Sequence, residues 1–210
     1  MGGVPMPGPL VFFDVDTQVD FMRPTGRLAV PGAEQIVANL ERLMTWARKH
    51  EVPIISTADA HSIDDPEFQT WPPHCVVGTP GQRRIPETEI ASPVVVPRIL
   101  GAFQPPLKWE GQFVVEKTAY TPEDNPNFPA LLGALGPRQA AVFGVATEYC
   151  VRATALALRK HGFAVNLVVD AIKPITEAGG HKALAEMKEE GVRMVSTAEA
   201  CCQPSCPSST

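Results

Sequence analysis

The sequence LVFFDV at residues 10–15 is a nearly continuous apolar run. A strand exposed on one face alternates between apolar and polar residues, whereas a strand covered by helices on both faces does not. This run is therefore typical of a central strand in a parallel sheet, and it predicts an α/β protein.

The rest of the chain alternates between helical and strand patterns. After the break at Pro31-Gly32, apolar residues recur at helical spacing over 33–49. The other predicted strands are 52–57, 113–116, 140–145, 163–169 and 192–195. The other predicted helices are 129–135, 148–160 and 181–190. This alternation predicts a single-domain, three-layer α/β/α fold with a parallel sheet of about six strands and right-handed crossovers.

One long segment, 58–107, interrupts this alternation with Pro, Gly and polar residues and one short apolar run at 94–96. A loop of this length in a compact domain is usually functional. No repeat or linker divides the chain, so residues 1–200 are predicted to form one domain. The Cys-, Pro- and Ser-rich tail, 201–210, is expected to be mobile. It holds three of the five cysteines, which are expected to be free thiols in a reducing compartment.

Composition and missing motifs argue against several classes of function. The chain is 44% hydrophobic and carries a formal net charge of −5 with acidic and basic residues interspersed, which disfavours a nucleic-acid partner. No apolar run reaches the ~18–20 residues of a membrane span, and the N-terminus lacks the positive charge of a signal peptide. A cytoplasmic location and no membrane partner are the expectation, while a homo-oligomer stays open. Dinucleotide, Walker and serine-elbow motifs are also missing.

Three residues suited to covalent chemistry lie at or just beyond predicted strand ends. Asp16 follows the first strand, Lys117 follows FVVE, and Cys150 lies in the first turn of the helix after AAVFGV. Ligands of such sheets bind outside the carboxyl ends of the strands, so these side chains are expected to meet. The helix dipole favours a thiolate at Cys150, and an acid could accept and return the thiol proton. The alternatives are an inert buried thiol, a turn-capping carboxylate and a solvated lysine.

A second group of polar residues follows the strand at 52–57. Asp59 and His61, in TADAH, lie two apart, so in an extended segment both side chains face one side. His74 and Glu67 from the next loop could complete a set of N/O ligands, which suits Zn²⁺, Fe²⁺ or Mn²⁺. A surface turn is the alternative. Cys75 is a further candidate ligand, although adjacent ligands are geometrically awkward.

At these residues the chain resembles the nicotinamidase/pyrazinamidase branch of the isochorismatase-like cysteine hydrolases. The similarity covers nearly the whole chain apart from the tail, and the WPPHC and GTPG segments are the ones typical of nicotinamidases. The matching stretches are DTQVDFM (16–22), GRLAVPGA (26–33), TADAH (57–61), WPPHCVVGTPG (71–81), EKTAYT (116–121), GVATEYCVRATA (144–155) and VVDA (168–171).

The resemblance implies a six-stranded parallel sheet and a catalytic triad of Asp16, Lys117 and Cys150. Asp14 precedes Asp16 in DVDTQVDF, but the family pattern D-x-Q-x-D-F matches Asp16. The resemblance also implies one divalent metal ion, Zn with Fe or Mn as alternatives. Its ligands would be Asp59, His61 and His74, with Glu67 as the candidate for a fourth.

The resemblance further implies roles for backbone and aromatic groups. The backbone amides of Ala146 and Cys150 would form an oxyanion hole, beside a cis peptide bond at Val145–Ala146. The aromatic residues that would wall a pyridine ring are Phe21, Trp71 and Tyr120.

The activity implied is hydrolysis of nicotinamide to nicotinate and ammonia through a cysteine thioester, in NAD salvage, with pyrazinamide also accepted. The metal would bind the ring nitrogen. The alternative is another cysteine amidohydrolase of the superfamily that acts on a different amide or carbamoyl substrate. A non-catalytic α/β binding module is disfavoured, because all three triad residue types are present.

Overall fold

A computed structural model describes residues 9–136 and 138–202 of the 210-residue chain. Its centre is a seven-stranded sheet with the order β3-β4-β2-β1-β5-β6-β7, in which every neighbouring pair is parallel. The strands are β1 (Leu10–Val15), β2 (Ile54–Asp59), β3 (Val94–Val96), β4 (Gln112–Lys117), β5 (Gln139–Val145), β6 (Ala164–Lys173) and β7 (Arg193–Val195). The predicted parallel α/β sheet is confirmed.

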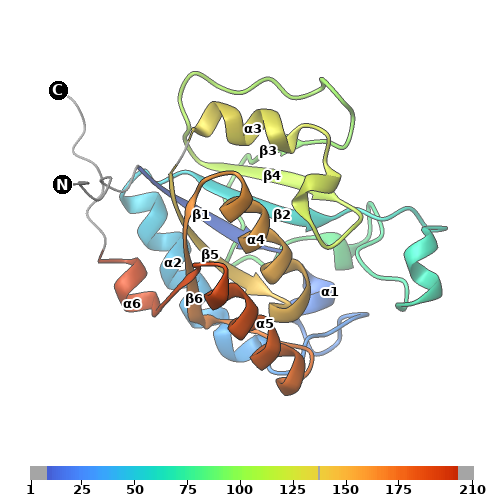
Figure 1. Cartoon of the computed structure of the whole chain (residues 1–210). Helices are drawn as coiled ribbons and strands as arrows, with labels where there is room; N and C mark the ends of the chain where they lie inside the picture. The colour runs from blue at the N-terminus through green and yellow to red at the C-terminus, as the bar shows by residue number, and fades with distance from the viewer. Residues whose placement is uncertain (1–8, 137, 203–210) are drawn as a thin grey trace, which may run out of the picture.

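Helices cover both faces of this sheet (Figure 1). They are α1 (Val19–Met22), α2 (Val37–Lys49), α3 (Phe128–Leu135), α4 (Arg152–Lys160), α5 (Glu177–Glu189) and α6 (Thr197–Ala200). One buried cluster joins α3, α4 and α5 to the sheet, and a second cluster joins α1, α2 and α6 to the opposite face. The predicted three-layer arrangement is confirmed.

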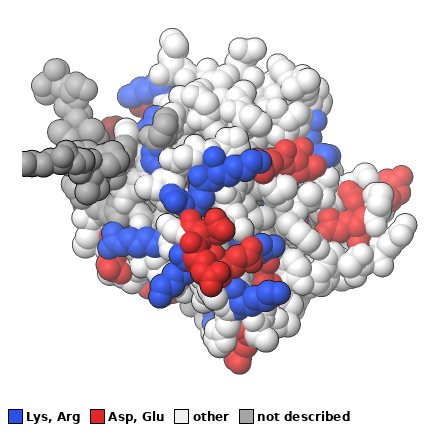
Figure 2. Space-filling view, viewed as in Figure 1, with Lys and Arg blue, Asp and Glu red and all other residues white. Residues whose placement is uncertain are grey.

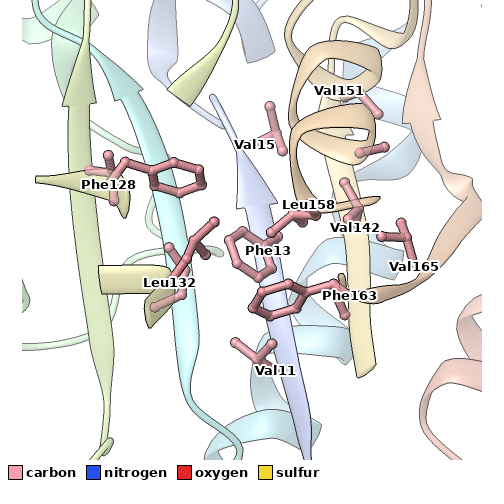
Figure 3. Close-up of a cluster of buried hydrophobic side chains, with 14 of the residues drawn as sticks. Val11, Phe13, Val15, Phe128, Leu132, Val142, Val151, Leu158, Phe163 and Val165 are labelled. Atoms are coloured by element: carbon pink, nitrogen blue, oxygen red, sulfur yellow. The ribbon is translucent and has the colours of Figure 1, made fainter. Parts of the chain in front are cut away.

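Strand β1 supplies side chains to both clusters, which explains its unbroken apolar run. Phe13 belongs to the cluster that includes α3, α4 and α5, and its ring meets that of Phe163 edge to face, with centroids 6.3 Å apart (Figure 3). Phe12, the next residue, points to the other face and stacks on Trp46 of α2 at 5.6 Å. All six residues of β1 are buried.

The sheet has one more strand than the six predicted from the sequence. The additional strand, β3, is a three-valine segment between Pro93 and Pro97 at the edge of the sheet, inside the segment predicted to be a loop. Three residues between prolines are too few to give a strand pattern on their own. Its pairing with β4 supplies the hydrogen bonds that keep it extended.

Two other elements differ in length from the prediction. Helix α5 begins at Glu177 and not at 181, because the Thr176 side chain accepts a hydrogen bond from Gly179 N and caps it. The Gly179-Gly180 pair weakens the helical pattern in this first turn. Strand β6 continues beyond 169, because the carboxylate of Asp170 is satisfied by the Thr197 backbone amide and hydroxyl at 2.7 and 2.8 Å.

On the face of the molecule that carries α4 and α5, acidic side chains form a group with basic side chains around it (Figure 2). Arg152 pairs with Glu186 at 2.7 Å, and Lys160 pairs with Glu123 at 3.0 Å. None of the helices in the described ranges is long and apolar enough to cross a membrane. Of the tail predicted at 201–210, only Cys201 and Cys202 lie within the described residues.

Candidate active site

Adjacent strands deliver the three predicted reactive side chains to one end of the sheet. Lys117 is the last residue of β4, Asp16 directly follows β1, and Cys150 lies in a π-helical turn, Thr147–Val151, that follows β5. Strands β4, β2, β1 and β5 are consecutive in the sheet and parallel, so their carboxyl ends lie at the same edge. The expected meeting of these residues is therefore observed.

The three side chains are in direct contact and buried. The Lys117 ammonium lies 2.8 Å from Oδ2 of Asp16 and 3.5 Å from the sulfur of Cys150. The other carboxylate oxygen of Asp16 accepts a hydrogen bond of 2.5 Å from the Thr57 hydroxyl. Lys117 is fully buried and not solvated, because Asp59 supplies a second carboxylate partner.

Burial and charge together set the protonation states of these groups. Burial lowers the pKa of the Lys117 ammonium, but Asp16 and Asp59 outweigh this effect and hold the pKa well above its ordinary value. Burial raises the pKa of the Asp16 carboxyl, and Lys117 offsets this only in part. Lys117 is therefore charged in the resting site, and Asp16 is an acid with an increased affinity for a proton.

The thiol of Cys150 differs from the sequence expectation. Burial raises its pKa, Lys117 lowers it, and Asp16 and Asp59 raise it again, so that the net pKa lies well above the ordinary thiol value. The helix dipole was expected to favour a thiolate, but desolvation and two nearby carboxylates outweigh it. The direction of this shift favours the protonated form of the Cys150 thiol.

The backbone before Cys150 has two unusual features. The Val145–Ala146 peptide bond is cis, at the position that the family resemblance implies. Gly144 has a φ of +117°, and a Cβ there would overlap the carbonyl oxygen of Val15 on the neighbouring strand. Only glycine fits at this point, where β5 turns toward the site.

A second cluster of buried side chains lies beside the triad, at the end of β2. His61 Nε2 and His74 Nε2 lie 3.6 and 3.7 Å from the same oxygen of Asp59, Oδ2. The other oxygen of Asp59 pairs with Lys117. Asp59 therefore connects the two histidines to the triad.

Both histidines direct Nε2 into this cluster, while Nδ1 of each ring contacts an oxygen outside it. Nδ1 of His61 contacts Asp65 Oδ2 at 3.0 Å, and Nδ1 of His74 contacts the Pro72 carbonyl at 2.9 Å. When Nδ1 donates to these acceptors, Nε2 carries the lone pair, as in metal-ligating histidines. His61 Nε2 is buried without a hydrogen-bond partner. One carboxylate oxygen and two imidazole nitrogens within 4.8 Å of one another can hold a divalent metal ion.

Glu67, the candidate for a fourth ligand, reaches the same cluster. Its Oε2 lies 3.9 Å from His61 Nε2, and burial raises the pKa of its carboxyl. The role of Asp65 as the partner of His61 Nδ1 was not predicted from the sequence. A carboxylate four residues after a candidate ligand histidine could have indicated it, because ligand histidines usually donate their second ring nitrogen to such a group.

Two alternative residues lie apart from this chemistry. Asp14 pairs with the buried Arg84 and accepts hydrogen bonds from Thr17 and Ser56. It is thus occupied in a separate network, and Asp16 is the acid beside Cys150. Cys75 directs its sulfur toward the Gly81 carbonyl, 4.0 Å away.

A pocket opens over the triad and the metal-ligand cluster. The three predicted aromatic residues line it together with Tyr149, which was missed although it directly precedes Cys150. Trp71 donates a hydrogen bond of 2.9 Å to the Tyr120 hydroxyl, and Tyr149 packs against both rings. The lining residues are Asp16, Phe21, Leu28, Val30, Asp59, Glu67, Trp71, His74, Tyr120, Val145, Ala146, Tyr149, Cys150 and Ile175.

The chain is similar to known proteins over most of its length. The family model described as the isochorismatase domain matches residues 10–199. The chain is 28% identical to the nicotinamidase/pyrazinamidase of Mycobacterium tuberculosis, over 86% of this chain and 95% of that protein.

Solved structures are similar over the same span. Pyrazinamidase of Pyrococcus horikoshii in complex with zinc superposes with a TM-score of 0.74 at 31% identity, over 90% of this chain and 99% of that one. PnC1 from L. infantum in complex with nicotinate gives a TM-score of 0.72 at 25% identity, over 90% and 93%. The chain belongs to the isochorismatase domain family of hydrolases.

Proposed function

We propose that this protein is a nicotinamidase: a metal-dependent cysteine amidohydrolase that converts nicotinamide to nicotinate and ammonia, and that also accepts pyrazinamide. The observation that carries the proposal is that Asp59 contacts both the triad and the two histidines of the candidate metal site. One of its oxygens pairs with Lys117, which lies 2.8 Å from Asp16 and 3.5 Å from Cys150, and the other faces His61 and His74. A substrate in the pocket can therefore meet a nucleophile and a metal ion together.

The nucleophilic step follows from the protonation states. The Cys150 sulfur attacks the carboxamide carbon while its proton passes to Asp16, whose pKa is raised by burial and thus suits a general base. The charged Lys117 offsets the negative charge that develops around the sulfur and Asp16. The backbone amides of Ala146 and Cys150, which border the pocket, are proposed to donate to the oxyanion.

The second half of the reaction returns the proton. Asp16 protonates the leaving nitrogen, ammonia departs, and an acyl thioester remains on Cys150. Water then attacks the thioester carbonyl carbon while Asp16 takes one of its protons. The C–S bond breaks, nicotinate leaves, and Asp16 returns the proton to the sulfur, which restores the thiol. Because nicotinate is the product, NAD salvage is the role proposed for this reaction.

The metal site is proposed to fix the orientation of the ring. Asp59, His61 and His74 would hold the ion, with Glu67 as the fourth protein ligand, and Zn²⁺ suits these donors, with Fe²⁺ or Mn²⁺ as alternatives. When bound, the ion supplies a Lewis acid that accepts the ring nitrogen lone pair. The similarity to a pyrazinamidase in complex with zinc supports this choice.

The pocket favours a neutral aromatic amide over other amide substrates. Phe21, Trp71 and Tyr120 supply flat apolar surface for a ring. The lining contains acidic side chains but no Lys or Arg, so a second carboxylate on the substrate would find no cationic side chain there. Within the alternative, amide or carbamoyl substrates that carry a carboxylate of their own are therefore disfavoured.

Ammonia release from nicotinamide tests the proposal. We expect turnover of nicotinamide and pyrazinamide, loss of turnover after chelation, and recovery when Zn²⁺ is returned. Benzamide, which has the ring and the carboxamide but no ring nitrogen, should show a strongly increased KM. Ammonia release from a carbamoyl compound but not from nicotinamide would instead establish the alternative.

A further inference from the structure

Two buried polar residues of the segment DTQVDFM, residues 16–22, belong to neither the triad nor the metal ligands. Gln18 and Asp20 flank the start of helix α1, and neither lines the pocket. Burying polar side chains costs free energy unless their hydrogen bonds are satisfied. The partners of these two side chains are therefore informative about why they are buried.

The Gln18 side chain hydrogen-bonds to both the backbone amide and the backbone carbonyl of Asp59, a candidate metal ligand. Its side-chain oxygen accepts a hydrogen bond of 2.7 Å from the Asp59 amide, and its side-chain nitrogen donates one of 2.8 Å to the Asp59 carbonyl. The same nitrogen also donates to the Gln82 carbonyl at 2.8 Å. A paired contact of this kind fixes both the position and the rotation of Asp59 in the chain.

Asp20 holds the residue that follows His74. Its Oδ2 accepts a hydrogen bond of 2.8 Å from the Cys75 amide, and its Oδ1 accepts one of 3.0 Å from the Arg27 amide. Cys75 has a φ of +46°, a left-handed conformation that a residue with a side chain seldom adopts. The buried carboxylate stabilises this turn, which directs His74 toward Asp59.

Two glycines leave room for Asp20. A Cβ at Gly81 would overlap the Asp20 carboxylate, and a Cβ at Gly26 would overlap its backbone carbonyl. The two glycines belong to the segments GRLAVPGA and GTPG, and neither of them lines the pocket. Two loop segments, 26–28 and 75–81, therefore pack around the single buried residue Asp20.

We propose that Gln18 and Asp20 are positioning residues for the metal site: Gln18 orients Asp59, and Asp20 orients His74. This inference rests on the metal-binding part of the proposed function. Residues that orient metal ligands typically change affinity about 10–100-fold when they are replaced. Gln18 and Asp20 act on the backbone beside the ligands, so their loss should loosen the ligand geometry without removing any ligand.

The test measures Zn²⁺ affinity by competition with a chelator, together with the absorption spectrum of the Co²⁺-substituted protein. Gln18→Met removes the amide group and keeps a similar volume. The matched control is Gln112→Met. Gln112 begins β4, at the end of the strand away from Lys117, and is also buried. Its side-chain amide also donates two hydrogen bonds and accepts one. We expect Zn²⁺ affinity to fall about 10–100-fold in Gln18→Met and to be unchanged in Gln112→Met.

Asp20→Asn supplies a second variant of nearly identical shape. In asparagine an NH2 donor replaces one of the two carboxylate oxygens, so the amide of either Cys75 or Arg27 would face a donor and lose its acceptor. We expect weaker Zn²⁺ binding and an altered Co²⁺ spectrum, with an increase in KM larger than the decrease in kcat at saturating Zn²⁺. Wild-type affinity and spectrum in both variants, or equal loss in Gln112→Met, would overturn the inference. Failure of the wild-type protein to bind Zn²⁺ would instead refute the metal assignment itself.

Discussion

At the scale of single residues, the chemical state of Cys150 is the feature with the clearest experimental signature. Burial and the carboxylates of Asp16 and Asp59 raise the pKa of its thiol despite the nearby Lys117 ammonium. A raised pKa leaves the thiol protonated until the pH exceeds the ordinary value of about 8.5. In chelator-treated protein, alkylation of Cys150 by iodoacetamide should therefore be slow at neutral pH and accelerate only above that value. Mass spectrometry of the Cys150 peptide measures this, and a rate already constant below neutral pH would indicate a resting thiolate.

Replacing Cys150, the proposed nucleophile, separates catalysis from metal binding. Cys150→Ala should reduce ammonia release to background, because no other described thiol lies beside Lys117. Metal content should be retained, since Asp59, His61 and His74 are unchanged. Elemental analysis and an ammonia assay on the same sample check both statements, with Cys201→Ala as the thiol control that keeps turnover. Near-normal turnover in Cys150→Ala would exclude it as the nucleophile.

The residues brought together at strand ends were predictable, whereas their supporting partners were not. Asp16 and Lys117 could be placed near each other because parallel strands end at one edge of the sheet. The contact of Asp20 with Cys75 joins residues 55 positions apart and depends on the path of a loop. The raised pKa of the Cys150 thiol was not expected from the sequence for a similar reason, since the nearby carboxylates come from the ends of two other strands.

At the scale of secondary-structure elements, a strand or helix could be predicted from the sequence when enough consecutive residues followed its hydrophobic pattern. The central strands β1 and β5 are continuous apolar runs that pack on both faces, and their residues were assigned correctly. Strand β3 has only three residues and exists through its pairing with β4. The first turn of α5 contains two glycines and depends on the Thr176 cap, a tertiary detail that outweighs helix propensity.

A pair of glycine substitutions tests how β5 approaches the nucleophile. Gly144→Ala should destabilise the protein by about 2–3 kcal/mol or more, because a Cβ would overlap the Val15 carbonyl at a φ of +117°. Gly133→Ala, in the interior of α3 with open space around it, should stabilise by about 0.5–1 kcal/mol. Urea unfolding compares the two variants. Equal effects of the same sign would contradict the close approach of β5 to β1.

At the scale of the whole molecule, the metal-ligand cluster joins parts of the chain that the hydrophobic core does not hold together. Asp59 ends β2, whereas His74 lies in the long segment between β2 and β3 that contributes few residues to either buried cluster. An ion bound to both would therefore fix this segment against the sheet. Because the unfolded chain has no such preformed site, binding should also stabilise the fold.

Removing the metal should therefore lower the melting temperature. With free Zn²⁺ at about 100 times its Kd, linkage predicts about 2.7 kcal/mol of stabilisation, and at roughly 2–4 °C per kcal/mol for a chain of this size the shift is about 5–10 °C. Thermal melts of the Zn²⁺-loaded, chelated and reloaded protein measure it. His61→Ala should melt at one temperature with or without Zn²⁺, whereas His181→Ala, on the exposed side of α5, should keep the full shift. The His61→Ala substitution removes one of the three buried candidate ligands at the end of β2. If this variant still showed the full Zn²⁺-dependent shift, Zn²⁺ would have to stabilise the fold from a different site.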